Sequence, residues 1–261
     1  MDASWRRPAA LAAPTASTLL GEVALTRLMS IAYFPHVAFL VLSTAMLGTG
    51  VAAAVQSLFP IADDVVARAQ TAVLMVGAGV AFLVGHAAVH LVGAEPLAVS
   101  GAPAELVRLG IALLALALPF AASGAAVTRL LTARGDESFR MYAADLGGAA
   151  LGCALAVPAM NVVGPRGAIF VAAAVAGGGA SLLLPSRKGA VALAAGALLG
   201  LAASPAADRL LPLHISSAKV TQSGEPFARV LQDPRLTRES EETAHPRLDL
   251  VAFTPSVHRV M

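Results

Sequence analysis

Long runs of apolar residues follow one another through the first 205 residues of the chain and are separated by short polar breaks. A helix needs about 20 mostly apolar residues to cross the hydrocarbon core of a bilayer. The candidate runs cover residues 11–33, 36–57, 70–93, 105–131, 141–163, 166–185 and 189–205. This pattern predicts an all-α, polytopic bundle of about seven transmembrane helices over residues 1–205.

Proline, glycine and charged residues mark the ends of these runs. The breaks are Phe34-Pro35-His36, 57–69, 93–103, 133–138, Gly164-Pro165 and Pro185-Ser186-Arg187-Lys188. Each of them separates two predicted spans.

Residues 206–261 differ from the rest of the chain, because they contain no long apolar run. They hold seven of the 18 Lys and Arg residues and seven of the 16 Asp and Glu residues. Within them, residues 226–231 could form a short helix, and residues 248–253 have the composition of a strand. A segment of about 50 residues rarely builds a stable core alone. We therefore expect a second region, 206–261, that is a short, polar, partly disordered tail.

The composition supports a membrane protein. Hydrophobic residues make up 57% of the chain and charged residues 13%, whereas soluble domains carry about 25% charged residues. The mean hydropathy is +0.75. Basic residues form no cluster, which argues against nucleic acid as a partner and leaves the lipid bilayer. With Cys153 as the one cysteine, no internal disulfide can form.

Positive charge is biased toward one side of the predicted bundle, which favours a cytoplasmic N-terminus. With that orientation, the basic residues on the cytoplasmic side are Arg6, Arg7, Arg68, Arg134, Arg140, Arg187 and Lys188. Only Arg108 and Arg166 fall on the other side. Seven crossings would place the tail outside the cell, whereas six or eight would return it to the cytoplasm.

Several ionisable side chains lie inside the predicted spans, where they are costly to bury and often functional. Glu22 and Arg27 are five residues apart in the first span, about 140° around a helix, so partners on other helices are expected. Asp145 lies one turn into the fifth span, with Arg140 and Tyr142 nearby. Together these five residues are a candidate intramembrane polar network. The alternative is a structural ion-pair cluster that fixes helix register.

His86 and His90 are one turn apart on the third span and share a face. Two histidines can contribute to a zinc site, but such a site needs three or four ligands. The pair is therefore a weak metal candidate, and we expect no metal. A hydrated cavity or the membrane surface is the other interpretation.

Proline and glycine residues also lie inside several of the predicted spans. Pro119 lies midway through the fourth span, followed by Gly124, and could kink the helix or line a cavity. Gly148 with Gly152, and Gly196 with Gly200, have the spacing that allows close helix packing. The glycines of the second, third and sixth spans follow no strand, so dinucleotide binding is excluded by context.

Three segments carry a resemblance to a known family. They are Gly21-Glu22-Val23-Ala24-Leu25-Thr26-Arg27-Leu28, Met46-Leu47-Gly48-Thr49-Gly50 and, most specifically, Tyr142-Ala143-Ala144-Asp145-Leu146-Gly147-Gly148-Ala149-Ala150-Leu151-Gly152. Through them, and through Pro119 with Gly124, residues 18–205 resemble the membrane domain of bacterial multi-pass spermidine synthase-like proteins. The resemblance implies an inner-membrane location.

The tail is similar to the linker before the catalytic domain of such proteins, through Lys219 and Arg247-Leu248-Asp249-Leu250-Val251. In that family a Rossmann-like aminopropyltransferase or methyltransferase-type domain follows and uses an S-adenosylmethionine derivative. This chain has no Gly-rich turn after Val251, so we expect no cofactor and no catalytic residue here. The resemblance implies an anchor or substrate-handling domain, not catalytic by itself, that works with a separate or downstream cytoplasmic catalytic domain.

Two other functions stay open. A small-solute transporter or channel could use the intramembrane charges as a pathway. A membrane enzyme could build a site from Glu22, Asp145 and the two histidines.

Overall fold

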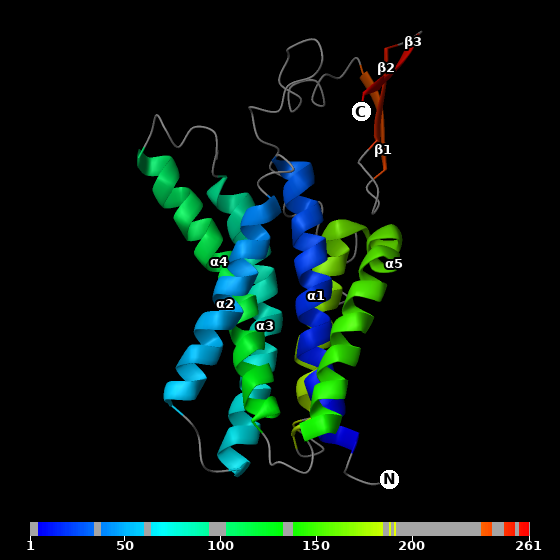
Figure 1. The fold of residues 1–261 in the computed structure, drawn as a ribbon. Helices are drawn as coiled ribbons and strands as arrows, with labels where there is room; N and C mark the ends of the chain where they lie inside the picture. Colours follow the sequence, from blue (N-terminus) through cyan, green and yellow to red (C-terminus); the bar gives the residue numbers. More distant parts are fainter. Residues whose placement is uncertain are drawn as a thin grey trace.

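The computed structural model describes ten stretches of the chain. They are residues 5–33, 38–59, 64–93, 103–132, 138–184, 188, 191, 236–241, 248–253 and 256–260. Five long helices account for most of them: α1 (Arg6–Ala32), α2 (Ala38–Leu58), α3 (Asp64–Val92), α4 (Pro103–Leu131) and α5 (Ser138–Gly179). A short 3₁₀ turn, η5 (Ala180–Leu182), follows α5. The helices lie side by side as a bundle (Figure 1).

All five helices are long and apolar enough to cross a membrane. Large apolar side chains cover the outside of the bundle, among them Phe39 (70% exposed) and Leu114 (68% exposed). An outer surface of this kind is satisfied by lipid rather than water. The helical membrane bundle predicted from the apolar runs is thus the architecture that the structure shows.

Helix α5 is a hairpin rather than one rod. Gly148 and Gly152 lie against Ala12 and Ala16 of α1, and Ala172 is hydrogen-bonded to Ser17 of the same helix. A straight helix of 42 residues would be about 63 Å long, so its two halves could not meet the same stretch of α1. The chain reverses at Gly164, where φ is 74° and ψ is 169°. We call residues 138–163 arm 1 and residues 165–179 arm 2 (Figure 1).

The reversal has a local cause in the sequence. A positive φ is open to glycine and strained for other residues, and Pro165 fits the first turn of a helix, where no backbone N–H is needed. The two arms correspond to the predicted spans 141–163 and 166–185, and Gly164-Pro165 is the break between them.

The number of spans differs from the prediction. The described residues contain five helices of spanning length and not seven, and one of them, α5, holds the fifth and sixth predicted spans as arm 1 and arm 2. The seventh predicted span, 189–205, lies outside the described residues apart from Val191.

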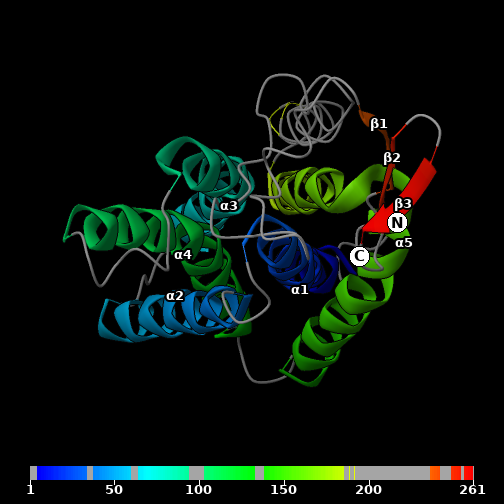
Figure 2. The same ribbon diagram turned by 90° about the horizontal axis from the view of Figure 1, so that it is seen from above.

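Helix α1 lies in the middle of the bundle, with α5 on one side and α2, α3 and α4 on the other (Figure 2). Its first half packs on glycine backbone: a Cβ atom at Gly152 would overlap the carbonyl oxygen of Ala16. Further along, Gly21 lies under the ring of Phe82, which meets the ring of Phe120 edge-on at 5.7 Å between centroids. Small residues therefore let arm 1 approach α1 closely and make room for the ring of Phe82 from α3.

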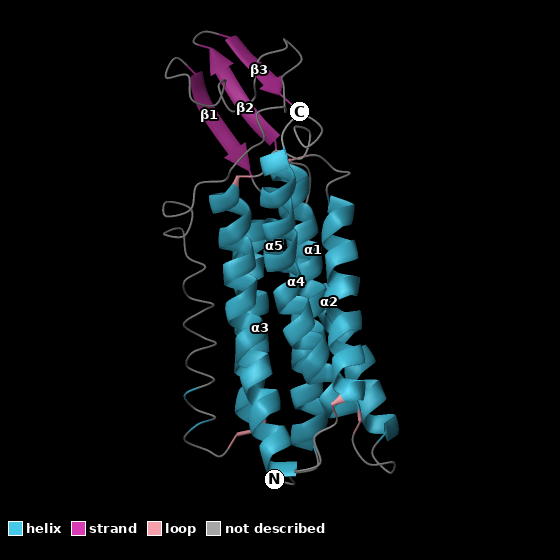
Figure 3. Cartoon of the chain, turned by 90° about the vertical axis from the view of Figure 1, so that its left-hand side faces the viewer, coloured by secondary structure: helices cyan, strands magenta, loops and turns pink. Residues whose placement is uncertain are grey.

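The tail contains three short strands, β1 (Leu236–Glu241), β2 (Leu248–Phe253) and β3 (Ser256–Val260). They form one antiparallel sheet in the order β1-β2-β3, with Arg238 opposite Val251 (Figure 3). The strand predicted at 248–253 is confirmed and is the middle strand. The helical fold class therefore holds for the bundle, and the tail adds a small sheet to it. The short helix predicted at 226–231 lies outside the described residues.

Replacing Gly152 by Ala should destabilise the bundle, because the new methyl group would meet the backbone of Ala16, which cannot rotate away. Gly147→Ala is the matched control, since the space beside Gly147 is open. Both changes gain similar helix propensity, so their difference isolates packing. We expect Gly152→Ala to be less stable than Gly147→Ala by about 1–3 kcal/mol, measured by reversible unfolding in detergent. Equal stabilities would contradict the contact between α1 and arm 1.

Replacing Gly164 by Ala should weaken the reversal between the arms. Apart from the adjacent residues, no atom lies within 4 Å of the position that a Cβ atom at Gly164 would take, so any loss comes from the backbone conformation and not from a clash. A non-glycine residue in this region costs about 1–3 kcal/mol. Thermal unfolding of Gly164→Ala beside Gly147→Ala measures the difference. A Gly164→Ala variant as stable as the wild type would show that the chain reverses elsewhere.

Candidate functional site

Arm 1 runs parallel to α1, and this direction decides where the predicted network residues lie. The step from Gly148 to Gly152 matches the step from Ala12 to Ala16. Asp145, three residues before Gly148, is therefore level with the start of α1. Glu22 lies 13 residues further along α1, about 20 Å away at 1.5 Å per residue.

The five predicted network residues are consequently divided between two ends of the bundle. Arg140, Tyr142 and Asp145 lie at the end where α1 begins, with Tyr142 59% exposed. Glu22 and Arg27 lie in the second half of α1. No hydrogen bond or ion pair joins any two of the five within the described part of the chain. The structure does not bring them together as one network.

Asp145 is half-buried against α1, and its Oδ1 atom is buried without a hydrogen-bond partner. Arg140 is exposed one and a half turns before it. This carboxyl group is the acidic side chain that arm 1 presents to the bundle.

A second set of polar residues meets between α3 and arm 2. A Cβ atom at Gly79 would lie 2.7 Å from the carbonyl oxygen of Ala173, which fixes the antiparallel register of the two helices. His86 is seven residues after Gly79, and Arg166 is seven residues before Ala173. Seven residues are about two full turns, so both side chains lie on the contact faces and at the same level.

The corner where α3 meets arm 2 holds the buried side chains of His86 and Arg166, and His90 stands beside His86. His86 is 2% exposed and Arg166 is 7% exposed. The ring of His86 meets Phe170 of arm 2 at 6.2 Å between centroids. The rings of His86 and His90 stand edge-on at 4.5 Å. The shared face predicted for the two histidines is confirmed.

This corner does not make a metal centre within the described residues. No group of three or more His, Cys, Asp or Glu side chains occurs in the described stretches. The positive charge of Arg166, at the same level as His86, would also oppose a cation. The sequence placed Arg166 at the start of the predicted span 166–185, on the side away from the cytoplasm, and indicated no site role for it.

Arg27 lies at the level of the same corner, on α1. It is eleven residues after Ala16, which is three turns and about 20°, so it faces arm 1 as Ala16 does. The corresponding position on arm 1 is Val163, at the bend of the hairpin. Arg27 is half-buried, and its Nε and Nη2 atoms are buried without hydrogen-bond partners.

A further polar contact that the sequence did not suggest lies near the opposite end of the bundle. Arg129 of α4 donates from Nε to Oε1 of Gln56 on α2 at 2.9 Å. It donates from Nη1 to Oε1 of Gln70 on α3 at 3.2 Å. Arg129 therefore joins the ends of three helices.

Pro119 and Gly124 serve packing within α4. The helix continues on both sides of the buried Pro119. A Cβ atom at Gly124 would lie 2.8 Å from Cα of Thr49 on α2. Gly48 of α2 packs in turn on the backbone of α4, so Gly48 and Gly124 hold α2 against α4.

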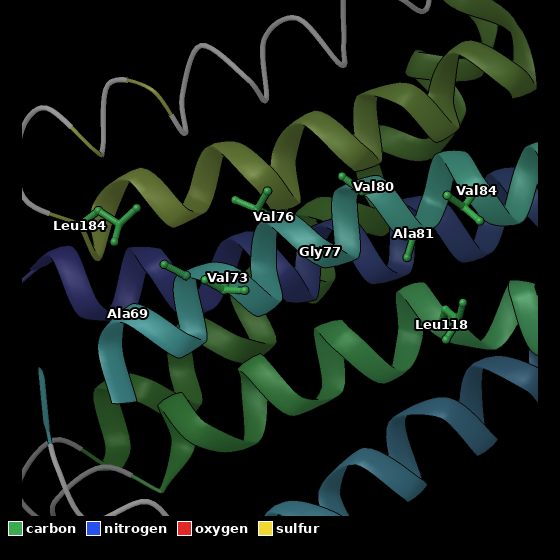
Figure 4. Close-up of a pocket in the computed structure, with 10 residues that line it drawn as sticks. Ala69, Val73, Val76, Gly77, Val80, Ala81, Val84, Leu118 and Leu184 are labelled. Carbon is green, nitrogen blue, oxygen red and sulfur yellow. The ribbon is translucent and has the colours of Figure 1, made fainter. Parts of the chain in front are cut away.

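A groove of about 530 Å³ lies along α3 (Figure 4). Every lining residue is apolar or glycine: Ala69, Ala72, Val73, Val76, Gly77, Val80, Ala81, Val84, Leu118 and Leu184. Such a groove offers no polar contacts to a hydrophilic solute.

No family model, curated protein or solved structure matches this chain.

Because Glu22 and Asp145 lie far apart, their effects on stability should add. Residues more than about 10 Å apart usually combine within about 0.5 kcal/mol. We expect a double-mutant cycle of Glu22→Gln and Asp145→Asn, measured by unfolding in detergent, to give a coupling energy within that limit.

A matched positive control is the cycle of Arg129→Met and Gln56→Leu, whose side chains are hydrogen-bonded. That pair should couple by about 1 kcal/mol or more. A comparable coupling between Glu22 and Asp145 would restore the predicted network.

Proposed function

We propose that this protein is a membrane anchor, a helical bundle that holds a C-terminal segment at one face of the bilayer. The observation that carries the proposal is the close packing of α1 on both arms of α5. Backbone contacts at Gly148 and Gly152 leave no room for a passage between α1 and arm 1. A central helix packed this closely on both arms suits an anchor better than a protein that must open alternately to two sides.

The distribution of polar groups supports the same proposal. Asp145 lies at one end of the bundle and the Arg27, His86 and Arg166 level at the other, separated by the apolar core around Phe82 and Phe120. The groove along α3 is apolar. A pathway for a hydrophilic solute would need a series of polar groups at intermediate depths. The described helices place one ionisable side chain there, Glu22 of α1, so transport is the weaker candidate.

Within this proposal, only the bundle resembles the membrane domain of spermidine synthase-like proteins. Its two best segments, 21–28 and 142–152, lie on α1 and arm 1, where small residues make the closest helix contacts. Their role as a packing seam would explain such a pattern without a catalytic task. A separate catalytic domain on the cytoplasmic side is the partner that an anchor of this type would hold.

For orientation, we propose a cytoplasmic N-terminus in a bacterial inner membrane. Arg6, Arg7, Arg68 and Arg140 lie at the N-terminal ends of α1, α3 and arm 1, which share one end of the bundle. Basic residues are favoured on the cytoplasmic side. The sheet is drawn at the end opposite the N-terminus (Figure 1), so the tail would face away from the cytoplasm.

Cysteine labelling of the full chain in intact cells tests this arrangement. In a Cys153→Ala background, Arg238→Cys in β1 should react with a membrane-impermeant maleimide. Arg140→Cys, at the other end of the bundle, should react only after permeabilisation. Equal labelling of the two positions in intact cells would overturn the proposed arrangement.

Transport is tested on the same protein in liposomes. We expect no uptake of spermidine or other small solutes above that of empty liposomes. An uptake that disappears in Asp145→Asn while that variant stays folded would replace the anchor by the transporter.

A further inference from the structure

The groove along α3 is an apolar face that the described helices leave open. Val73 is 70% exposed, and Val84 is exposed too. Both line the groove, together with Leu118 of α4 and with Leu184, which follows η5 (Figure 4). The lining residues on α3 begin at Ala69 and end at Val84, a distance of about 22 Å along the helix axis. The open face is therefore long enough to receive most of a membrane-spanning helix.

The chain leaves the described bundle at one end of this groove. Leu184 packs against a buried cluster that contains Ala72 and Met75, near the start of α3. A Cβ atom at Gly179, five residues earlier, would meet the side chain of Ala13 near the start of α1. Leu184 thus lies at the end of the bundle where α1 and α3 begin.

The described chain resumes at the other end of the bundle, at Leu236 in β1 (Figure 1, Figure 3). Residues 185–235 must therefore lead from one side of the membrane to the other in the arrangement proposed above. A single segment can cross lipid only as a helix, because its backbone groups must be hydrogen-bonded internally. Residues 189–205 are the long apolar run of that stretch, and they include no Asp, Glu, Lys or Arg.

The connection to this run is short. Three residues separate Leu184 from Lys188, and both Lys188 and Val191 are helical. Consecutive helices with a short connection are usually antiparallel neighbours. The run would therefore turn back beside arm 2, whose other neighbour is the open face of α3. As a helix, residues 189–205 would be about 25 Å long, which matches the length of the groove.

The run also has a face that suits the valines of α3. In a helix, Ala192, Gly196 and Gly200 would share one face, and none of them has more than a methyl group. Small residues let helices approach closely in lipid. Val191 would lie about 140° around the helix from Gly196, and its side chain is 69% exposed. The small face can thus meet the groove while Val191 faces the lipid.

We propose that residues 189–205 occupy the groove as a helix parallel to α3. Ala192, Gly196 and Gly200 lie against the α3 valines, and the helix carries the chain from the end at Leu184 to the side of the sheet. The groove is then an internal contact and not a binding site for a solute. The side on which this helix ends rests on the arrangement under the proposed function, whereas its place in the groove does not.

Disulfide cross-linking of the full chain in membranes tests the proposal. In a Cys153→Ala background, Val80→Cys in the groove is combined in turn with a cysteine at each position from Gly196 to Ala203. A protease site inserted in the break at 133–138 divides the chain, so that only a cross-linked chain stays in one piece after cleavage. We expect cross-linking to peak every three or four positions, because only one helix face comes within disulfide reach, about 7 Å between Cα atoms.

Val51→Cys, combined with the same positions, is the matched control. Val51 is an exposed valine near the middle of α2, as Val80 is on α3. Helix α4 lies between α2 and α3 (Figure 2). The control should therefore give at least about tenfold less cross-linked chain, since it lies beyond disulfide reach of a helix in the groove.

Replacing Gly77 by Leu gives a readout that needs no cysteine. The described residues leave the space beside Gly77 open, and the same holds for Gly50 on α2. A leucine at position 77 should overlap with a helix in the groove, whereas a leucine at position 50 should meet only lipid. We expect the Tm of Gly77→Leu in detergent to be several degrees below that of Gly50→Leu.

Two results would overturn the proposal. Cross-links found only between two chains, as a band of doubled mass before cleavage, would assign the groove to a second copy. Absence of cross-links at every position, with equal Tm values for the two leucine variants, would leave the groove to lipid.

The labelling of Arg238→Cys separates this proposal from the anchor arrangement. If the cross-links form but Arg238→Cys reacts only after permeabilisation, the arrangement fails and the helix in the groove stands. If Arg238→Cys reacts in intact cells but no cross-link forms, the arrangement stands and the helix crosses elsewhere.

Discussion

The backbone of α1 lies directly against both arms of α5, and the rest of the bundle depends on this contact. Ala12 and Ala16 meet the glycines of arm 1, while Ser17 Oγ donates to the carbonyl oxygen of Ala172 on arm 2 at 2.7 Å. In lipid, helices gain little from the hydrophobic effect, so close van der Waals packing and occasional hydrogen bonds hold them together. One helix is thereby fixed to a hairpin, and α3 packs on both through Gly21 and Gly79.

This contact also decides which charged groups can meet. Because arm 1 is parallel to α1, the start of one lies beside the start of the other, and Asp145 is held far from Glu22 and Arg27. Because arm 2 is antiparallel to α3, Arg166 lies level with His86. Arg27, His86 and Arg166 consequently lie toward one end of the bundle and Asp145 toward the other, with Glu22 between them on α1. The proposed anchor role rests in part on that separation.

Much of the fold could be predicted from the sequence, because the length of an apolar run and the residues that end a helix are local properties. The runs at 11–33, 36–57, 70–93 and 105–131 became α1 to α4, and Gly164-Pro165 marked the hairpin. The spacing of Gly148 and Gly152 correctly indicated a packing face. The candidate site was harder to predict. An ion pair between helices depends on their axial register, and apolar helices carry little local information about register. For that reason the sequence did not indicate that Arg166 lies level with His86.

The sequence by itself determined that the chain forms apolar helices of membrane length, where most of them end, and that its last residues are of a different kind. Hydrophobic length and the conformations of glycine and proline suffice for this. Only the tertiary structure decided which helix faces meet, at what level, and in which direction. Those choices depend on small differences in side-chain volume along α1, α3 and α5, which act only when the helices are already side by side. The same differences set Arg27 at the bend of the hairpin and left its donors without a partner.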